Sequence, residues 1–383
     1  MLKLRSISKK EFDNFIKEQN NTHYMHSSAW GEFEKVTNNV STHYLGLVNE
    51  DNDILAATIL LEEHLPLNCS NLTAPHGFIV DYENKRLVKI FNNKIKKFAK
   101  IKKATSIKIN PSIPITNDFK SLLKDMGYKK DITTDIEYTY SLILDKTLKE
   151  IEKNYSESTK KELEETEKYD LELVLGNQKD LNELFLLNNN QNKNYYETLY
   201  DIFSNSEHTK IKLFLGKLHI TKTIKILEKE IIRTNNQIAI IPIDNLDSSS
   251  KERLTSLRSK KEFLSKSLKE FKEYKLKYGN SLTISASLIM EQKNNAWILE
   301  EFKHDIIKET TLANNIYNEY IKYYKNNSFT KINQISKESK GFGDDITEYT
   351  EKYILIVNKI TYIIQNKVLP FFNKIKQNKK ESE

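Results

Sequence analysis

The hydrophobic pattern between residues 220 and 278 differs from that of the rest of the chain. Apolar residues recur three or four positions apart among lysines and glutamates, at Ile220, Ile224, Leu227, Ile231, Ile238, Leu254, Leu257, Leu264, Leu268, Phe271 and Tyr278. This spacing places the side chains on one face of a helix. Pro242 divides the stretch, because proline cannot continue a helix, and Ser248 to Ser250 can cap the next one. We therefore expect an antiparallel helical arm with Leu257, Leu264 and Phe271 in its seam.

Residues 1–145 alternate between strand and helix patterns. The stretch 42–63 alternates about the polar turn NEDND and predicts a strand hairpin. Residues 87–101 predict a helix, since their apolar side chains share one face with lysines opposite. A short strand ending at Pro111 and a closing strand over 137–144 follow. This order indicates an α/β layer domain.

A similar order recurs on both sides of the arm. Before it come a strand, two helices and a strand, and after it a hairpin, a helix over 311–324, a strand, one strand candidate over 345–357 and a C-terminal helix. We predict two copies of one α/β fold, at 1–145 and at 146–219 with 279–383. The arm at 220–278 is then an insertion whose two ends lie close together.

Composition narrows the class of protein. A chain of 383 residues is too long for one hydrophobic core of ordinary size, so we expect two or more domains. The charge of +7 attracts anions weakly, and the lysines are mixed with glutamates, so a solvated surface is the favoured interpretation. Cys69 is alone and the histidines lack ligand spacing, so we expect no disulfide, metal or cofactor. No leader and no apolar run near the ~20 residues of a membrane span are evident, which predicts a cytoplasmic chain.

Two motifs in the first predicted domain are similar to patterns of one known family. SSAWGEFEK is similar to Q-S-x-x-W-x-x-x-K, with Trp30 in place and Lys35 one position late. TAPHGFIVD is similar to Y-A-P-R-G-F-x-x-D, with Gly77 and Asp81 in place and His76 where arginine is usual. Both patterns are typical of the FemABX aminoacyltransferases.

Two further motifs of that family follow in the second predicted domain. STKKELEETEKYDLELV is similar to T-R-R-N-I-K-K-A-x-K-x-G-L-x-V, with Lys160 and Lys161 at the basic positions. KGFGDDITEYTEKYILIVNK keeps the lysine and the Gly-Phe-Gly turn of its counterpart, whereas Glu338 and Ser339 replace a Phe-Lys pair. Four motifs in the family's order around a helical arm identify the chain as a FemABX member along nearly its whole length.

The resemblance implies both a fold and an activity. The implied fold class is α/β (α+β), with two GNAT-like (acetyltransferase-like) domains, the second interrupted by an antiparallel coiled-coil arm. The implied activity is a tRNA-dependent aminoacyltransferase that adds an amino acid to the stem peptide of a peptidoglycan precursor, forming an interpeptide bridge. The implied partners are aminoacyl-tRNA and a UDP-linked or lipid-linked muropeptide, with peripheral membrane contact and no transmembrane segment.

The resemblance and the chemistry together suggest site residues. Lysines suit the phosphates of the precursor and tyrosine hydroxyls its peptide, so the expected substrate-binding residues are Lys35, His76, Lys160, Lys161, Tyr195 and Tyr196. The expected catalytic residues are Lys340, the candidate for polarising the ester carbonyl, and Phe342 in the Gly-Phe-Gly turn that follows it. The competing interpretations are surface charge for the lysines, helix packing for the tyrosines, a structural role for His76 and a plain loop residue for Lys340.

Two other functions stay open at this stage. The substitutions fall at charged positions of the family motifs, so the chain could be a catalytically impaired binding or scaffold protein that uses the arm for partner contacts. A transferase of the same fold with another acyl donor is the third interpretation.

Overall fold

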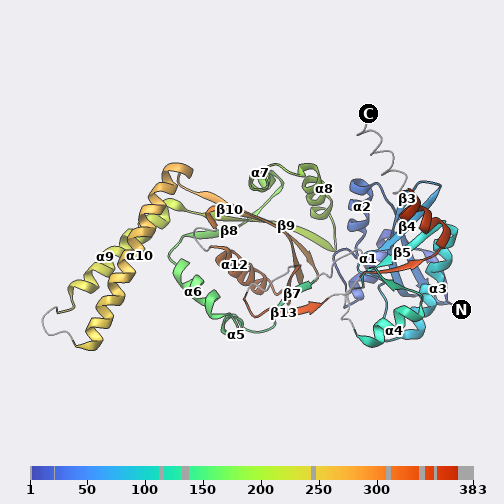
Figure 1. Cartoon of the computed structure of the whole chain (residues 1–383), viewed down its shortest axis with the longest axis horizontal. Helices are drawn as coiled ribbons and strands as arrows, with labels where there is room; N and C mark the ends of the chain where they lie inside the picture. The colour runs from blue at the N-terminus through green and yellow to red at the C-terminus, as the bar shows by residue number, and fades with distance from the viewer. Residues whose placement is uncertain are drawn as a thin grey trace.

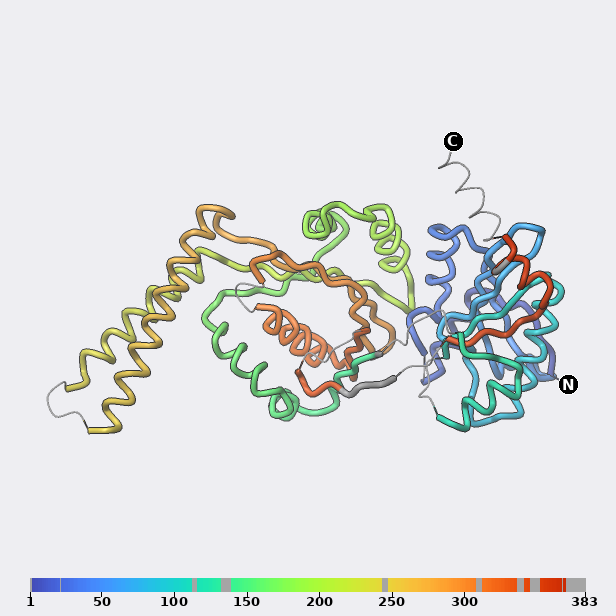
Figure 2. The backbone as a smooth tube through the Cα atoms, in the orientation of Figure 1, coloured from blue at the N-terminus to red at the C-terminus, as the bar shows by residue number. Residues whose placement is uncertain are grey.

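The computed structural model describes residues 2–20, 22–111, 116–131, 138–242, 247–307, 312–335, 341–348 and 352–369. The molecule is elongated, with a helical arm at one end, a second sheet in the middle and a first sheet at the other end (Figure 1, Figure 2). Each of the two sheets has seven strands.

The first sheet carries helices on both faces. Its strands, in spatial order, are β1 (Lys3–Ser6), β2 (Ser41–Val48), β3 (Ile54–Leu65), β4 (Cys69–Ala74), β5 (Ala104–Ile109), β14 (Tyr353–Ile356) and β6 (Lys129–Lys130). The predicted amphipathic helix is α3 (Lys85–Ile101), which buries Phe91 and Ile95 against one face beside α4 (Asn117–Asp125). On the other face α1 (Lys9–Glu18) buries Phe12 against Tyr44 and Ile59. Because successive side chains of a strand point to opposite faces of the sheet, each strand contributes residues to both cores.

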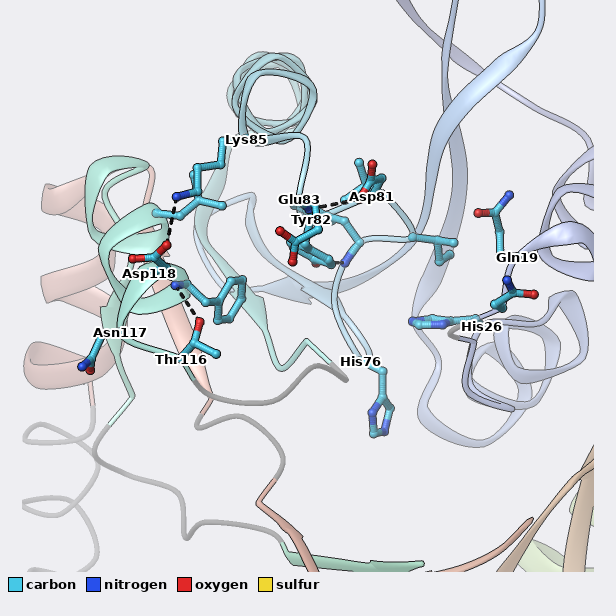
Figure 3. Close-up of a pocket in the computed structure, with 16 residues that line it drawn as sticks. Gln19, His26, His76, Asp81, Tyr82, Glu83, Lys85, Thr116, Asn117 and Asp118 are labelled. Carbon is cyan, nitrogen blue, oxygen red and sulfur yellow. Dashed lines mark hydrogen bonds and ion pairs between the residues drawn. The ribbon is translucent and has the colours of Figure 1, made fainter. Parts of the chain in front are cut away.

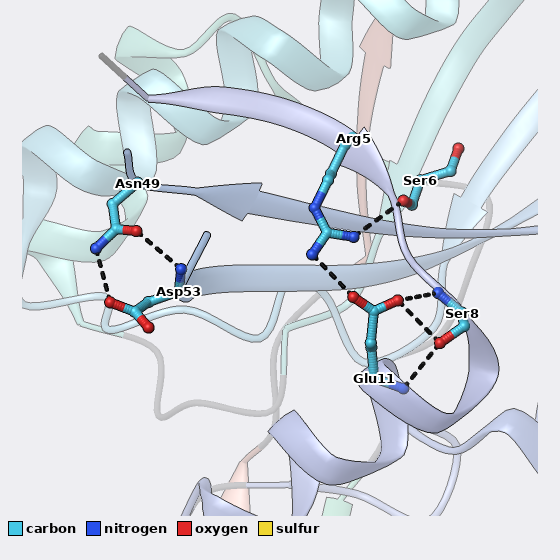
Figure 4. A network of polar contacts seen from close by, with 6 residues as sticks. All are labelled: Arg5, Ser6, Ser8, Glu11, Asn49 and Asp53. Carbon is cyan, nitrogen blue, oxygen red and sulfur yellow. Dashed lines mark hydrogen bonds and ion pairs between the residues drawn. The ribbon is translucent and has the colours of Figure 1, made fainter. Parts of the chain in front are cut away.

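A polar network fixes where α1 begins. The Ser8 hydroxyl accepts from the Glu11 amide at 3.2 Å, and the Glu11 carboxylate accepts from the Ser8 amide at 2.8 Å (Figure 4). This reciprocal cap satisfies two otherwise free donors. Arg5 on β1 pairs with Glu11 at 2.8 Å, and its hydrogen bond is the main cause that lowers the pKa of Glu11 to about 2.

The second sheet is also covered on both faces. Its strands, in spatial order, are β13 (Asp345–Glu348), β7 (Tyr138–Ile143), β12 (Lys331–Ile335), β11 (Asn295–Lys303), β10 (Leu282–Gln292), β9 (Thr209–Leu218) and β8 (Leu171–Gly176). One face packs against α5 (Leu148–Lys153), α6 (Glu157–Thr166) and α12 (Ala313–Asn326). The other face packs against α7 (Leu181–Leu187) and α8 (Lys193–Ser204), and this core continues into α2 (Ser28–Asn38) of the first domain.

The two sheets share one pairing pattern but exchange a strand. Counted from β1 in the first sheet and from β8 in the second, three antiparallel pairs lead to one parallel pair, β4 with β5 and β11 with β12, and then to two antiparallel pairs. In this count the sixth position of the first sheet is filled by β14 and that of the second by β7. The predicted boundary at 145 and the assignment of all of 279–383 to the second domain are therefore wrong for these two strands. Alternating apolar residues predict a strand but do not reveal its partner.

The helical arm is present as α9 (Ile220–Ala239) and α10 (Ser248–Tyr278). Its two ends meet, since the amide of Thr221 donates to the Asn280 carbonyl at 3.1 Å. Leu264 and Phe271 are 1% exposed, and Leu257 is half-buried. The cap of α10 is Asp247, whose carboxylate accepts from the Ser250 amide at 2.7 Å, rather than one of the three serines.

Candidate active site

A pocket of about 800 Å³ opens in the first domain between the end of α1, the loop after β4 and the start of α4 (Figure 3). Its lining is rich in charged and polar side chains, among them Gln19, His26, His76, Asp81, Glu83, Lys85 and Asp118. The second sequence motif therefore forms much of this pocket.

A tight turn shapes the loop after β4. His76 and Gly77 both adopt positive φ angles, 53° and 83°. A side chain at Gly77 would bring its Cβ within 2.7 Å of the Cα of Pro111, so only glycine fits. The His76 amide donates to the Asn110 side chain at 2.8 Å, which holds the turn against the end of β5. The turn thereby directs Asp81 toward the pocket at the start of α3.

The charge of the lining is predominantly negative. Among the described lining residues there are three carboxylates, Asp81, Glu83 and Asp118, and one lysine, Lys85. Lys85 pairs with Asp118 at 3.3 Å, and Asp81 accepts from the backbone amide of Glu83 at 3.0 Å. A lining of this kind attracts an ammonium group and repels a phosphate.

Three histidines cluster at the inner end of the pocket, near the second domain: His26 and His76 line the pocket, and His23 packs beside His76 without lining it. The Nε2 atom of His26 lies 3.1 Å from the Pro75 carbonyl, and its Nδ1 accepts from the His23 amide at 3.2 Å. Because a carbonyl can only accept, the His26 proton must sit on Nε2. The His23 ring stacks on His76 at 3.5 Å between centroids and meets Trp297 of β11 at 5.4 Å.

All three imidazoles are held neutral. Burial lowers the pKa of His26 to about 4 and that of His76 to about 3, and it lowers the pKa of His23 well below its usual value. For His23 and His76 the nearness of the other histidines lowers the pKa further. These side chains are therefore uncharged at neutral pH, and both ring nitrogens of His26 are already engaged by the Pro75 carbonyl and the His23 amide. Within the described part of the chain, no group of three or more His, Cys, Asp or Glu side chains is arranged to hold a metal ion.

Tyr195 and Tyr196 lie on α8 where it meets α2, the helix that also carries Lys35. Tyr195 is 41% exposed and its ring contacts Phe33 at 5.1 Å between centroids. Tyr196 is 5% exposed and packs on Phe302 at 5.6 Å. Lys35 is exposed near the end of α2. Lys35 and Tyr195 are thus accessible, whereas most of Tyr196 belongs to the core.

The third and fourth sequence motifs meet at the start of α6. The Ser156 amide donates to the Gly341 carbonyl at 2.8 Å, and a Cβ at Gly341 would lie 2.6 Å from the hydroxyl of Thr159. Phe342 is fully buried, with ring contacts to Tyr155 at 4.7 Å and Tyr317 at 4.8 Å. The ring of Phe342, a predicted catalytic residue, therefore lies in the core, where it anchors the turn. Lys340, the other predicted catalytic residue, lies outside the described residues.

The two lysines of α6 have different surroundings. Lys160 lines a second pocket of about 880 Å³ between α5, α6 and α12, and it pairs with Glu157 at 2.9 Å. Lys161 is 77% exposed and lies 3.9 Å from Glu165. The predicted substrate-binding residues thus occupy three places rather than one groove: the first-domain pocket, the α2 and α8 contact, and α6.

Sequence reasoning gave no role to Asp81, His23 or His26. Asp81 was visible as a motif position, and its place in the family pattern was the signal that could have identified it. His23 and His26 carry no such signal, because the stacking with His76 depends on a loop-to-loop contact that residue spacing does not encode.

Comparison with known proteins agrees with these motifs. The sequence pattern of the FemAB family matches residues 7–368. The aminoacyltransferase FemA of Staphylococcus epidermidis is 21% identical, covering 95% of this chain and 98% of its own length. FemA of Staphylococcus aureus is 21% identical, covering 94% and 97%. The crystal structure of FemX shares the fold, with a TM-score of 0.73 at 18% identity over 94% of this chain and 99% of that chain. This chain therefore belongs to the FemAB family.

Proposed function

We propose that this protein is an aminoacyltransferase that moves an amino acid from aminoacyl-tRNA to an amine of the stem peptide of a peptidoglycan precursor. Membership of the FemAB family and the FemA relatives, which are named aminoacyltransferases and match nearly the whole chain, support this proposal. The observation that carries it is the acidic pocket of the first domain.

The pocket suits an amine acceptor. An alkyl amine enters as an ammonium ion, and a lining with three carboxylates and one lysine favours that charge. The amine must lose a proton before it can attack. We assign Asp81 to hold the ammonium and accept its proton, since Lys85 already pairs with Asp118. The neutral histidines add no positive charge to the pocket wall, so they do not repel the ammonium group.

The reaction balances without a cofactor. The deprotonated amine attacks the carbonyl carbon of the aminoacyl ester, and the new carbon–nitrogen bond gives a tetrahedral oxyanion. The nitrogen of this intermediate then gives up a proton, the bond to the ribose oxygen breaks, and that oxygen takes up a proton in turn. The products are an amide and uncharged tRNA. Stabilisation of the oxyanion by Lys340 remains a prediction from the sequence.

The diphosphate of the precursor belongs outside this pocket in our proposal, because the carboxylates would repel it. Lys35 on α2 and Lys160 on α6 are the candidates, and both are accessible. The ion pair of Lys160 with Glu157 opposes phosphate binding little, since exposed ion pairs contribute only about 0–1 kcal/mol.

The test is a transfer assay with charged tRNA and precursor, comparing wild type with Asp81→Asn. Loss of a general base should lower kcat/KM by about 10²-fold or more. Asp53→Asn is the matched control, because Asp53 is bound to Asn49 in the β2 to β3 turn (Figure 4) and does not line the pocket. Equal activity of wild type and Asp81→Asn would refute the role of Asp81. No product from wild type with any of several charged tRNAs would favour the scaffold interpretation.

A further inference from the structure

One short turn holds the helical arm against the second domain. We call it the seat turn, defined as residues 167–172, which join the end of α6 to the start of β8. The Nζ atom of Lys168 lies 3.8 Å from the centroid of the Phe263 ring on α10. The Tyr169 ring packs on Phe271 of the same helix at 4.8 Å between centroids. The seat turn therefore holds the second helix of the arm through two aromatic contacts.

The seat turn also contacts the first helix of the arm. The Thr223 hydroxyl accepts from the Asp170 amide at 3.0 Å, and the Asp170 carboxylate lies 3.6 Å from the Lys222 amine. The His219 ring, at the start of α9, lies 2.9 Å from the Glu172 carboxylate. Because this one turn is bonded to both helices, a change in the tilt of the arm displaces the turn.

Helix α6 connects the seat turn to the Gly-Phe-Gly turn at 341–343. It has ten residues, a length of about 15 Å, and runs from α5 toward the end of the second sheet that carries the arm (Figure 1). Just before its first residue, the Ser156 amide donates to the Gly341 carbonyl at 2.8 Å. A Cβ at Gly343 would lie 2.7 Å from the Cβ of Asn154. One end of α6 is thus attached to the arm, and the other end is attached to the Gly-Phe-Gly turn.

The sides of α6 are loosely packed. Of its ten residues only Thr159 and Thr166 are buried, and Leu163 is half-buried at the wall of the second pocket. Helix α12 contacts α6 through polar groups, since the Asn314 amide donates to the Glu162 carboxylate at 2.6 Å. The pocket of about 880 Å³ lies between these two helices and α5. A close-packed helix cannot shift without strain, whereas this pocket leaves α6 room to move.

We propose that α6 transmits changes in the tilt of the arm to the Gly-Phe-Gly turn. A partner that displaces the arm moves the seat turn, and α6 carries this displacement to the wall of the second pocket and to the turn that follows Lys340 in the sequence. Lys168, Tyr169 and Asp170 are then positioning residues, because they act through α6. Coupling between two sites is reciprocal, so a ligand in the second pocket also changes the tilt of the arm. The proposal does not depend on the transferase activity.

The test is amide hydrogen exchange of the full chain, comparing wild type with Lys168→Ala/Asp170→Ala, two side chains that do not line the second pocket. The Ser156 amide should exchange about fivefold faster or more in this variant, since the loss of a cation–π contact loosens the seat turn and α6 with it. The matched control is Glu228→Ala/Lys272→Ala, which removes an ion pair of 3.3 Å within the arm and should leave the Ser156 amide at its wild-type rate. Amides of α3 in the first domain should be unchanged in both variants.

A second measurement reports on the arm itself. Spin labels at Thr255→Cys on α10 and Glu207→Cys before β9 lie at exposed positions, and the native Cys69 is buried. The distance distribution between the labels should broaden in Lys168→Ala/Asp170→Ala. Three results would overturn the proposal. These are an unchanged distance distribution, a broadened distribution with wild-type exchange at Ser156, and faster exchange throughout the chain with α3 included, which would mean that the seat turn only stabilises the fold.

Discussion

Mild acid should destabilise this protein through its buried histidines. A histidine with a lowered pKa in the folded state takes up its proton first in the unfolded chain, where the pKa is about 6.5. Stability is therefore complete above that value and is lost as the pH falls toward the folded pKa, about 4 for His26 and about 3 for His76. A pH of about 5 lies roughly 1.5 units below the pKa of histidine in the unfolded chain. Protonation of the unfolded chain therefore lowers the free energy of unfolding by about 2 kcal/mol per histidine.

Urea unfolding near pH 7.5 and pH 5 measures this loss. Both tryptophans of the chain lie at the cluster, since Trp297 contacts His23 at 5.4 Å and Trp30 contacts Tyr24 at 5.7 Å, so their fluorescence reports on it. His26→Gln retains a donor for the Pro75 carbonyl but cannot titrate. It should be less stable at pH 7.5 and lose about 2 kcal/mol less than wild type on acidification.

The control is His64→Gln, at an exposed histidine on β3, which should keep the wild-type pH dependence. If wild type and His26→Gln lose equal stability between the two pH values, the buried neutral imidazole of His26 is not the cause and the reasoning fails.

Three further variants test the packing and the site. Phe342→Ala should cost about 3–5 kcal/mol in thermal unfolding, because the ring is fully buried, and a loss under about 1 kcal/mol would contradict its anchoring role. Gly77→Ala should lower the melting temperature more than Gly279→Ala. Both glycines have positive φ, but an added Cβ would have no atom within 4 Å at Gly279. Equal melting temperatures of the two variants would argue against the close approach of Gly77 to Pro111. Lys160→Ala should weaken the binding of a UDP-linked muropeptide, measured by calorimetry, by about 1 kcal/mol and by more than Lys161→Ala does. A larger loss for Lys161→Ala would place the phosphate site at Lys161 instead.

The sequence alone was enough to predict the elements in which apolar residues recur at a regular spacing. The arm, α3 and the β2 to β3 hairpin were predictable because their apolar spacing leaves few alternatives. The stretch 345–357 was not, since it contains two strands that join different sheets. Its pairing depends on contacts with β5 and β7, which are more than two hundred residues away along the chain.

The candidate site was predictable only in part. The motif around Gly77 and Asp81 marked the first-domain pocket, because a positive φ and a close approach require glycine there. The grouping of Lys35 with Lys160 and Lys161 was not supported by proximity, since spacing in the sequence does not indicate which helices face each other. The histidine cluster depends on the contact of residues 23–26 with the loop after β4, which only the folded chain reveals.

The central claim is that an amine of a precursor peptide receives an aminoacyl group. The most direct measurement is mass spectrometry of a peptidoglycan precursor after incubation with wild-type protein and charged tRNA, beside the same precursor with its acceptor amine acetylated. The account predicts that the free-amine precursor gains the mass of one or more aminoacyl residues and the acetylated one gains nothing. Equal modification of both precursors, or of neither across a full set of charged tRNAs, would contradict it.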